Sequence, residues 1–237
     1  MKRTSSPAAS RTGLQLSQSQ EDYLKALYLV RREGRRVTTS ELSARLAVSP
    51  ASAAEMLGRL SALGLVVHDR YRGAELTPAG EEVAVEMVRH HRLLEMYLAE
   101  MLGYRWDEVH EEAERLEHFI SERMEERIYD ALGRPALDPH GDPIPTVDGR
   151  VNPGRHRPLT ECRPGERLIV RRVSDREADK LRELARLGIG LGSVLEVLAE
   201  SVFEGPITVR VGGGRRATRV PLGIARVVFL GSLEGGA

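Results

Sequence analysis

Apolar residues recur every three or four positions through most of residues 21–132, a spacing that predicts amphipathic helices with one face in a core. We expect these helices at about 21–32, 41–46, 50–63, 77–103 and 106–132, with two short strands at 65–68 and 74–77 forming a hairpin. From residue 159 the pattern changes to short strands at 167–173, 193–198, 206–211, 216–220 and 225–230, with one helix at 175–187. The chain is therefore predicted to be mainly α with a small C-terminal β-barrel.

The first three helices and the hairpin follow the order of a winged helix-turn-helix, a fold that binds DNA. Thr39 or Ser40 is expected to cap the second helix, and Ser49 and Pro50 to begin the third. The start of the third helix would face base edges in the major groove, and arginines would contact phosphates. The DNA-contacting residues predicted in this way are Thr39, Ser40, Ser49, Pro50, Ala51, Ser52, Glu55, Arg59, Arg70 and Arg72. For each residue singly the alternative is a solvated side chain, and for the fold it is a winged helix that binds protein.

The formal net charge is zero, but the charges are unevenly distributed. Residues 1–77 carry 12 Lys and Arg against 7 Asp and Glu, residues 78–150 carry 8 against 18, and residues 151–237 carry 15 against 10. A basic N-terminal part and an acidic middle suggest separate partners, a polyanion for the first and cations for the second.

The acidic middle contains histidines and carboxylates at helical spacing, so that they share helix faces. They are His110, Glu114, Glu117 and His118 on the helix at 106–132, and His91 and Glu95 on the helix before it. Two such helices facing each other would supply ligands for one or two metal ions. The alternative is a solvated acidic helix with scattered histidines, because charged helix faces are common.

Several segments limit the possible roles of the chain. The Ser-rich segment at 1–19 has no apolar stretch, so it is predicted to be a disordered tail and not a secretory signal. No apolar run approaches the roughly 20 residues of a membrane span. Cys162 is the only cysteine, which excludes an internal disulfide, fits a cytoplasmic protein and leaves an ordinary thiol as the expected role. Residues 134–158 are rich in Pro and Gly and predict an irregular connector, in which Asp138-Pro-His-Gly141 is interpreted as a turn in preference to a ligand loop.

With these parts in order, the chain resembles the diphtheria toxin repressor family of metal-dependent transcriptional regulators over residues about 20–232. The motifs that carry the resemblance are Glu21-Asp-Tyr-Leu-Lys-Ala-Leu-Tyr28, Ser49-Pro-Ala-Ser52, Tyr71-Arg-Gly73 with Leu76-Thr-Pro-Ala-Gly80, His90-His-Arg-Leu-Leu-Glu95, the segment 109–118, Gly141-Asp-Pro-Ile-Pro145 and Leu187-Gly-Ile-Gly-Leu-Gly-Ser193. It implies a tail at 1–18, a winged helix-turn-helix at 19–80, a helical dimerisation and metal-binding domain at 81–145, a linker at 146–158 and an SH3-like or FeoA-like barrel at 159–233.

The resemblance also implies two metal sites. The primary site would consist of Asp22, Glu114, Glu117 and His118, and the ancillary site of His91, Glu95 and His110, to which the barrel would add Asp175 or Glu177. Iron-responding relatives carry Met and Cys in place of Asp22 and Glu114, whereas manganese-responding relatives carry Asp and Glu. These hard oxygen donors rank Mn²⁺ first and Fe²⁺ second. Lys25 stands where some manganese-responding relatives have a Glu ligand, which favours two separated sites over a close binuclear one.

The sequence therefore predicts a cytoplasmic, homodimeric, Mn²⁺-activated regulator that binds a palindromic DNA operator, controls metal-homeostasis genes such as transporters, and has no enzymatic activity or membrane partner. Three alternatives remain open: an Fe²⁺-responsive member of the same family, a metal-independent regulator that senses a ligand through the barrel, and a carboxylate-bridged di-metal enzyme. The enzyme would need paired Glu-x-x-His motifs on four helices. Repression and activation are not distinguished by the sequence.

Overall fold

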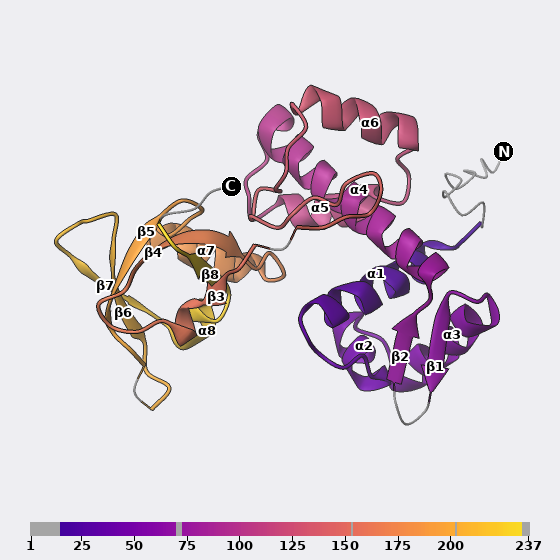
Figure 1. Ribbon diagram of the computed structural model, residues 1–237, viewed down its shortest axis with the longest axis horizontal. Coiled ribbons are helices and arrows are strands. Elements are labelled where there is room, and N and C mark those ends of the chain that lie inside the picture. The colour runs from indigo at the N-terminus through magenta and orange to yellow at the C-terminus, as the bar shows by residue number, and fades with distance from the viewer. Residues whose placement is uncertain (1–14, 70–72, 153, 202, 234–237) are drawn as a thin grey trace. The chain divides into compact units, whose positions relative to one another are not determined.

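The computed structural model describes residues 15–69, 73–152, 154–201 and 203–233 (Figure 1). Most of the tail predicted at 1–18, and the wing residues Arg70 and Arg72, lie outside the described residues. Within these ranges no helix combines the length and apolarity needed to cross a membrane. The chain divides into two compact units, one of residues 1–94, 113–134 and 144–151 and the other of residues 95–112, 135–143 and 152–237.

The first unit begins with three helices and an antiparallel hairpin, which confirms the predicted winged helix-turn-helix. The elements are α1 (Gln18–Arg32), α2 (Thr39–Arg45), α3 (Pro50–Ala62), β1 (Val66–Asp69) and β2 (Gly73–Leu76), with Val66 opposite Leu76 in the hairpin. One core holds them together because each helix buries the apolar side predicted by its spacing, including Leu24, Leu27, Leu42, Leu57 and Leu60. This packing leaves the start of α3 at the surface.

The N-caps in this unit differ in one place from the prediction. Ser49 caps α3 as expected, because its side chain accepts a hydrogen bond from the amide of Ser52. The cap of α2 is Thr38, whose hydroxyl accepts from the amide of Glu41, so the prediction of Thr39 or Ser40 was wrong. The helix starts earlier than the apolar spacing indicated, and both predicted residues lie in its first turn.

The long helix predicted at 106–132 is two helices, α5 (Val109–Leu116) and α6 (Glu122–Ala131), and this prediction was wrong. Ser121 has an extended backbone, and its side chain accepts from the amide of Met124, so it starts a new helix. Glu117 and His118 therefore lie in the turn after α5.

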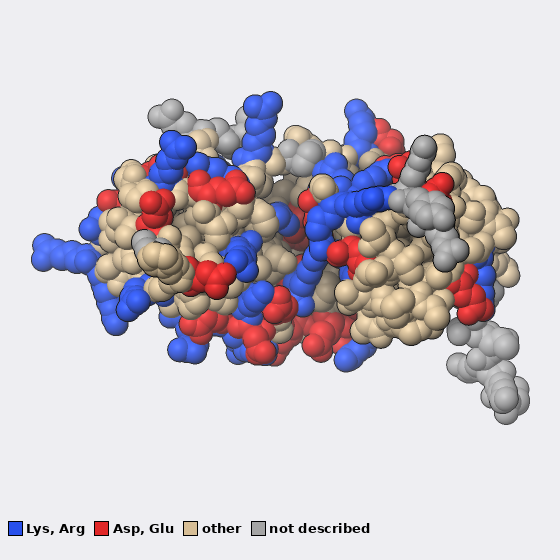
Figure 2. Space-filling model, turned by 90° about the horizontal axis from the view of Figure 1, so that it is seen from below, with Lys and Arg blue, Asp and Glu red and all other residues tan. Residues whose placement is uncertain are grey.

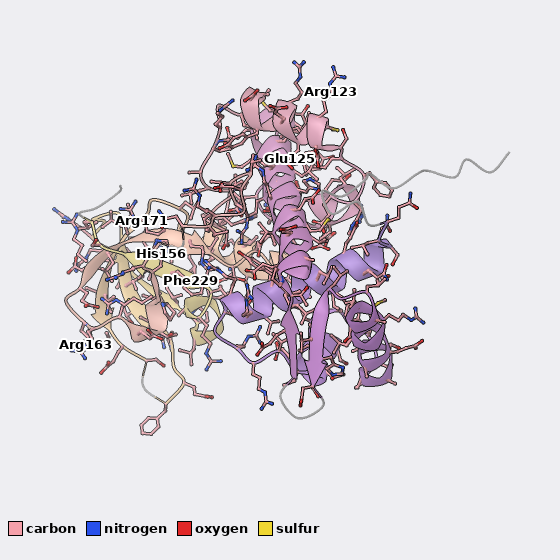
Figure 3. The ribbon with its side chains drawn as sticks, turned by 45° about the vertical axis from the view of Figure 1, so that its right-hand side comes forward. Arg123, Glu125, His156, Arg163, Arg171 and Phe229 are labelled. Atoms are coloured by element: carbon pink, nitrogen blue, oxygen red, sulfur yellow. The ribbon has the colours of Figure 1, made fainter. Side chains whose placement is uncertain are left out.

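The helix α4 (Pro78–Leu102) precedes α5, and α6 is attached to it by a buried ion-pair network. Arg89 of α4 donates to Glu125 of α6 through Nε, and His90 Nε2 lies 3.0 Å from the other oxygen of Glu125. Figure 3 shows Glu125 on the side of α6 toward α4, with Arg123 pointing away from it. Burial opposes the charge on Glu125, but the contacts to His90 and Arg89 outweigh it and hold its pKa below the ordinary value.

The second unit contains an antiparallel six-stranded sheet with its own hydrophobic core. Its elements are β3 (Arg157–Pro158), a 3₁₀ turn η1 (Leu159–Glu161), β4 (Arg167–Val173), α7 (Ala178–Arg186), β5 (Val194–Ala199), β6 (Ile207–Val211), β7 (Ala217–Val220), α8 (Leu222–Ala225) and β8 (Val228–Gly231). The strand order is β3-β8-β4-β5-β6-β7. Cys162 is buried in this core, and its thiol donates to the carbonyl oxygen of Pro158 at 3.5 Å.

Three details of this unit were not predicted. The short helix α8 occupies the start of the predicted strand at 225–230, which begins only at Val228. The strand β3 is only two residues long and has no recognisable alternation. The helix predicted from residue 175 starts at Ala178, so Asp175 lies in the segment between β4 and α7. This position matters for the second group of candidate ligands.

Candidate metal centre and DNA-binding surface

The first group of candidate ligands joins α1 to the segment that follows α5. Nε2 of His118 lies 3.1 Å from Oδ1 of Asp22, and Nδ1 of the same ring donates to Oε2 of Glu21 at 2.7 Å. Burial disfavours the charged imidazolium, but the hydrogen bonds to Asp22 and Glu21 outweigh it and raise the pKa of His118 to about 9. A histidine whose second ring nitrogen donates to a carboxylate is the usual arrangement for a metal ligand.

Glu117 connects this pair to a buried lysine. The ammonium group of Lys25 lies 2.7 Å from Glu114 Oε1 and 2.7 Å from Glu117 Oε1. His91 Nδ1 lies 2.6 Å from the other oxygen of Glu117 and 3.2 Å from the lysine nitrogen. Burial raises the pKa of Glu117, but His91 and Lys25 outweigh it and lower the pKa below its ordinary value. These side chains are therefore arranged around a positive charge, which Lys25 supplies.

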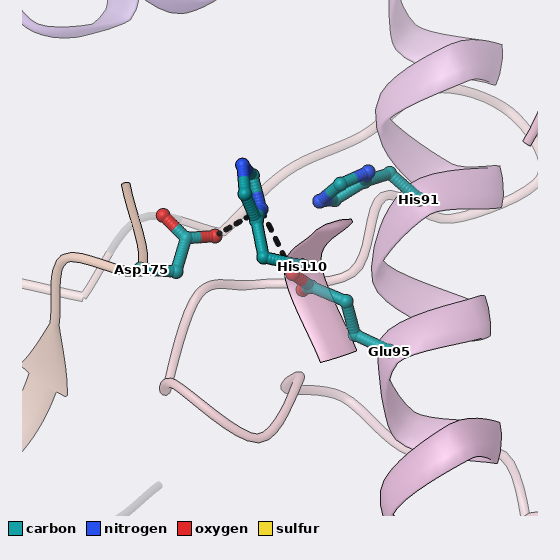
Figure 4. A group of neighbouring side chains, drawn as sticks. All are labelled: His91, Glu95, His110 and Asp175. Carbon is teal, nitrogen blue, oxygen red and sulfur yellow. Dashed lines mark hydrogen bonds and ion pairs between the residues drawn. The ribbon is translucent and has the colours of Figure 1, made fainter. Parts of the chain in front are cut away.

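The second group lies in the second unit. Glu95 of α4, His110 of α5 and Asp175 converge there, with His110 Nδ1 3.2 Å from Glu95 Oε1 and 3.4 Å from Asp175 Oδ2 (Figure 4). Burial disfavours the charge on His110, but the hydrogen bonds to Asp175 and Glu95 raise its pKa to about 10. His91 lies one turn before Glu95 on the same helix (Figure 4).

Of the two barrel residues expected near this group, the structure brings only one to it. Asp175 contacts His110, and although burial opposes its charge, that hydrogen bond lowers its pKa to about 2. Glu177 lies outside the group and forms a surface ion pair with Lys180 within α7 and its cap. The bend before α7 directs the carboxylate of Asp175 toward His110 and leaves the carboxylate of Glu177 exposed.

Both groups suit a divalent ion by the chemistry of their donors. Candidate ligand atoms of Asp22, Glu117 and His118 lie within 4.8 Å of one another, as do those of Glu95, His110 and Asp175. All are carboxylate oxygens or imidazole nitrogens, and Glu95 and Glu117 are completely buried. Buried carboxylates need a cation or hydrogen-bond donors to offset the loss of hydration, and a divalent ion supplies this charge.

The candidate DNA-contacting residues of α3 lie on one exposed side of the winged helix. Ser49, Pro50, Ala51, Ser52, Glu55 and Arg59 are exposed, Ser40 of α2 is exposed and Thr39 is half-buried. Arg59 forms an ion pair with Glu55 one turn before it on α3, and both side chains are exposed. Figure 2 shows basic and acidic side chains of the described residues on the same face of the molecule.

Models of known protein families match three successive segments of the chain. The N-terminal DNA-binding domain of iron-dependent repressors matches residues 15–74, their metal binding and dimerisation domain matches residues 77–146, and the FeoA domain matches residues 157–230. The iron-dependent repressor IdeR of Mycobacterium tuberculosis (strain H37Rv) is 30% identical over 214 residues, which cover 86% of this chain and 93% of that protein. The chain belongs to the diphtheria toxin repressor family of metal-dependent transcriptional repressors.

Other relatives of this repressor include proteins that are named for manganese and not for iron. The diphtheria toxin repressor of Corynebacterium diphtheriae is 28% identical over 81% of this chain and 88% of that protein. A manganese-dependent transcriptional repressor solved in complex with manganese is 42% identical, with a TM-score of 0.85 over 90% of this chain and 100% of that one. The manganese regulator SloR is 29% identical, with a TM-score of 0.75 over 90% of this chain and 98% of that one. The repressor is thus a DNA-binding protein with a dimerisation domain, and its family is not one of enzymes.

Sequence reasoning missed three side chains at these groups of the repressor. Glu21 was not predicted as a site residue, although it is adjacent to Asp22 and accepts a hydrogen bond from His118. Asp138 and His140 were assigned to a turn, and both are buried with Glu95. The pairing of residues so far apart along the chain left no periodic signal, and Asp138-Pro-His-Gly141 has the composition of an ordinary turn.

Proposed function

We propose that this repressor is activated by Mn²⁺ and, as a homodimer in the cytoplasm, binds a palindromic operator in front of metal-homeostasis genes such as transporters. The observation that carries the choice of metal is the donor set of the first group. Asp22, Glu114, Glu117 and His118 offer only oxygen and nitrogen, and the single cysteine lies in the core of the other unit. Hard carboxylate donors suit Mn²⁺, whereas thiolate or thioether donors would favour softer ions.

Two sets of ligands follow from the same proposal. The primary ion would be held by Asp22, Glu117 and His118, whose candidate ligand atoms lie within 4.8 Å of one another, with Glu114 as a fourth ligand beside Glu117. The ancillary ion would be held by Glu95, His110 and Asp175, with His91 as a fourth ligand. Affinity for divalent ions rises from Mn²⁺ through Fe²⁺ in most sites, so selection of Mn²⁺ must come from geometry and from the metal available in the cell. An Fe²⁺-responsive repressor is the second candidate, supported by the IdeR relatives.

The location of the first group gives a physical account of activation. Asp22 lies on α1, the first helix of the winged helix, whereas Glu117 and His118 follow α5, within the region matched by the dimerisation model. An ion held by all three would fix α1 against that region. It would favour the arrangement in which the two α3 helices of a dimer match successive turns of the major groove.

The test is selection of DNA sequences from a random double-stranded pool at one fixed salt concentration. The purified chain is incubated with Mn²⁺, with Fe²⁺ under anaerobic conditions, or with chelator. Salt is fixed because phosphate contacts change affinity steeply with ionic strength. We expect a palindromic site to be enriched with Mn²⁺ and not with chelator.

Other results identify which part of the proposal fails. Stronger enrichment with Fe²⁺ than with Mn²⁺ at equal free-metal activity assigns the chain to the iron-responding repressors. The same palindrome with chelator present contradicts metal activation and favours a regulator that senses a ligand through the barrel. Glu117→Gln should lose the metal response, whereas Glu126→Gln, an exposed carboxylate on α6, should keep it.

A further inference from the structure

The loop of residues 138–142 is tightly fixed in the second unit. Oδ1 of Asp138 accepts hydrogen bonds from the amides of His140 and Asp142, each at 2.9 Å, which closes the loop on itself. The amide of Val173 in β4 donates to the carbonyl oxygen of His140 at 2.9 Å. Gly141 has a φ of +87°, and a Cβ there would lie 2.1 Å from the carbonyl oxygen of Arg171. The backbone therefore holds the His140 side chain in one place.

The His140 ring is completely buried, and only one of its two nitrogens forms a hydrogen bond among the described residues. Its Nε2 donates to the carbonyl oxygen of Trp106 at 2.7 Å, and that bond places the ring proton on Nε2. Its Nδ1 is buried and has no hydrogen-bond partner among the described residues. Oε2 of the Glu95 carboxylate lies 3.8 Å from this nitrogen. This distance is too long for a hydrogen bond.

The same distance suits two ligands of one metal ion. Two donor atoms that each lie about 2.1 Å from an ion are separated by roughly 3 to 4 Å, depending on the angle at the metal. A histidine that binds metal through one nitrogen and donates to a backbone carbonyl through the other is the common arrangement. His140 has this arrangement, with Nδ1 as the nitrogen directed toward the carboxylate.

A third ligand completes the group. Candidate ligand atoms of Glu95, Asp138 and His140 lie within 4.8 Å of one another, and all three side chains are at least nine-tenths buried. Asp138 uses Oδ1 to hold the loop, and its Oδ2 is also buried. Glu95 meets His110 through Oε1 and faces His140 through Oε2. Its two oxygens are thus turned toward two different sets of ligands.

We propose that Glu95, Asp138 and His140 bind an additional divalent cation beside the ancillary ion, with Glu95 as a carboxylate shared between the two. The donor set of two carboxylates and one imidazole fits Mn²⁺ or Fe²⁺. The ion offsets two negative charges in a position from which water is excluded. The inference rests on the proposed role of Glu95 at the ancillary site, and it adds a third ion to each chain.

The test is to locate and count bound Mn²⁺ in the full-length protein. Crystals grown with Mn²⁺ and measured at the manganese absorption edge should show an anomalous peak between Glu95, Asp138 and His140, separate from those of the two other groups. Equilibrium dialysis followed by elemental analysis should give one fewer bound Mn²⁺ per chain in Asp138→Asn than in the unsubstituted protein. In this variant the amide oxygen keeps the two backbone hydrogen bonds of the loop, and the NH₂ group replaces the proposed ligand oxygen.

Matched variants separate loss of a ligand from loss of structure. Asp179→Asn, an exposed carboxylate on α7, should bind as many ions as the unsubstituted protein. His140→Gln should lose the same single ion as Asp138→Asn, and circular dichroism of the metal-free proteins identifies any variant that does not fold. For such a variant the anomalous map of the unsubstituted protein decides the question alone.

The inference is overturned if Asp138→Asn binds as many ions as the unsubstituted protein, or if the map has no peak beside His140 while the other groups are occupied. Those results leave Mn²⁺-dependent DNA binding intact. If DNA binding proves insensitive to chelator while the third ion is present, the proposed function fails and the site stands. A chain that binds no Mn²⁺ at all overturns both.

Discussion

At the scale of single residues, Lys25 supplies a buried positive charge to the candidate metal centre. It is a buried lysine on α1 in contact with two carboxylates, Glu114 and Glu117. Burial disfavours its charge, but the attraction and hydrogen bonds of these carboxylates outweigh burial and raise its pKa. Lys25 therefore holds a positive charge against two of the carboxylates that we propose as ligands of the primary ion.

Replacing Lys25 by Met should destabilise the metal-free protein by about 3 to 5 kcal/mol, because it leaves the buried carboxylate of Glu117 without its cation. Mn²⁺ should restore most of this stability, so the metal-induced rise in melting temperature should be larger in the variant than in the unsubstituted protein. Thermal unfolding with Mn²⁺ and with chelator measures both effects.

Lys180→Met is the control, because Lys180 forms a surface pair with Glu177 and should matter by less than about 1 kcal/mol. A metal-free Lys25→Met protein as stable as the unsubstituted one would show that the lysine does not stabilise the acidic group.

For single residues, the sequence predicted several of the candidate ligands but not the contacts that they make with their neighbours. Helical spacing and family motifs named Asp22, Glu117 and His118, which the fold brings together. Lys25 follows Asp22 by three residues, so helical geometry already placed both on one face. Its contacts with Glu114 and Glu117 depend on how α1 packs, and no local pattern in the sequence encodes that packing. The same holds for the pairing of Glu21 with His118, 97 positions apart.

At the scale of elements, the attachment of α6 to α4 depends on one carboxylate. Glu125→Gln should destabilise the metal-free protein by about 3 kcal/mol, because it leaves the buried guanidinium of Arg89 without its counter-ion. The pKa of Glu125 is lower in the folded chain than the ordinary 4.5, so its contribution is present above about pH 4.5 and is lost as the pH falls below that value. Glu125→Gln should therefore lose less stability than the unsubstituted protein as the pH falls.

Urea unfolding between about pH 3.5 and pH 6, without metal, measures this difference in slope. Glu126→Gln on the same helix is exposed and should behave like the unsubstituted protein. Parallel pH profiles for all three proteins would rule out the assigned role of Glu125.

The loop that carries His140 offers a second prediction about an element. Gly141→Ala should cost about 3 kcal/mol, combining a left-handed backbone with a Cβ that would lie 2.1 Å from the carbonyl oxygen of Arg171. Gly188→Ala has a similar positive φ with nothing within 4 Å of the added carbon, and should cost only about 1 kcal/mol. The difference between the destabilisation caused by Gly141→Ala and that caused by Gly188→Ala measures the cost of the steric clash with Arg171. Equal costs would mean that the loop moves away from β4 without penalty.

The elements themselves were mostly predictable, because apolar spacing fixes which residues face a core. The spacing gave the winged helix and most strands, but it continued unbroken across residues 117–121, where Ser121 starts a new helix. A single capping side chain outweighed the periodic pattern there. The two-residue strand β3 was missed because pairing with β8 defines it, and two residues cannot show alternation.

At the scale of the whole molecule, the two compact units have separate cores, and the candidate ligands are distributed between them. If an ion favours the DNA-binding arrangement, operator DNA must favour binding of the ion by the same factor, because the two equilibria are linked. We expect operator DNA to raise the apparent Mn²⁺ affinity by about 10- to 100-fold.

Metal titrations of the free protein, of its complex with operator and of its mixture with scrambled DNA of equal length measure this factor. The scrambled DNA controls for accumulation of Mn²⁺ around phosphates. An operator that leaves the Mn²⁺ affinity unchanged would show that metal binding and DNA binding are independent in this chain.

The buried lysine on α1 also bears on how the protein senses concentration. Glu114 and Glu117 already bind the ammonium group of Lys25. A divalent ion can bind these two carboxylates only as far as it displaces that group, as in an ion exchanger. The competitor is covalently attached, so its local concentration never changes with the medium. If Glu114 and Glu117 bind the ion as proposed, the contacts that they make with Lys25 would help to set the metal concentration at which the repressor responds.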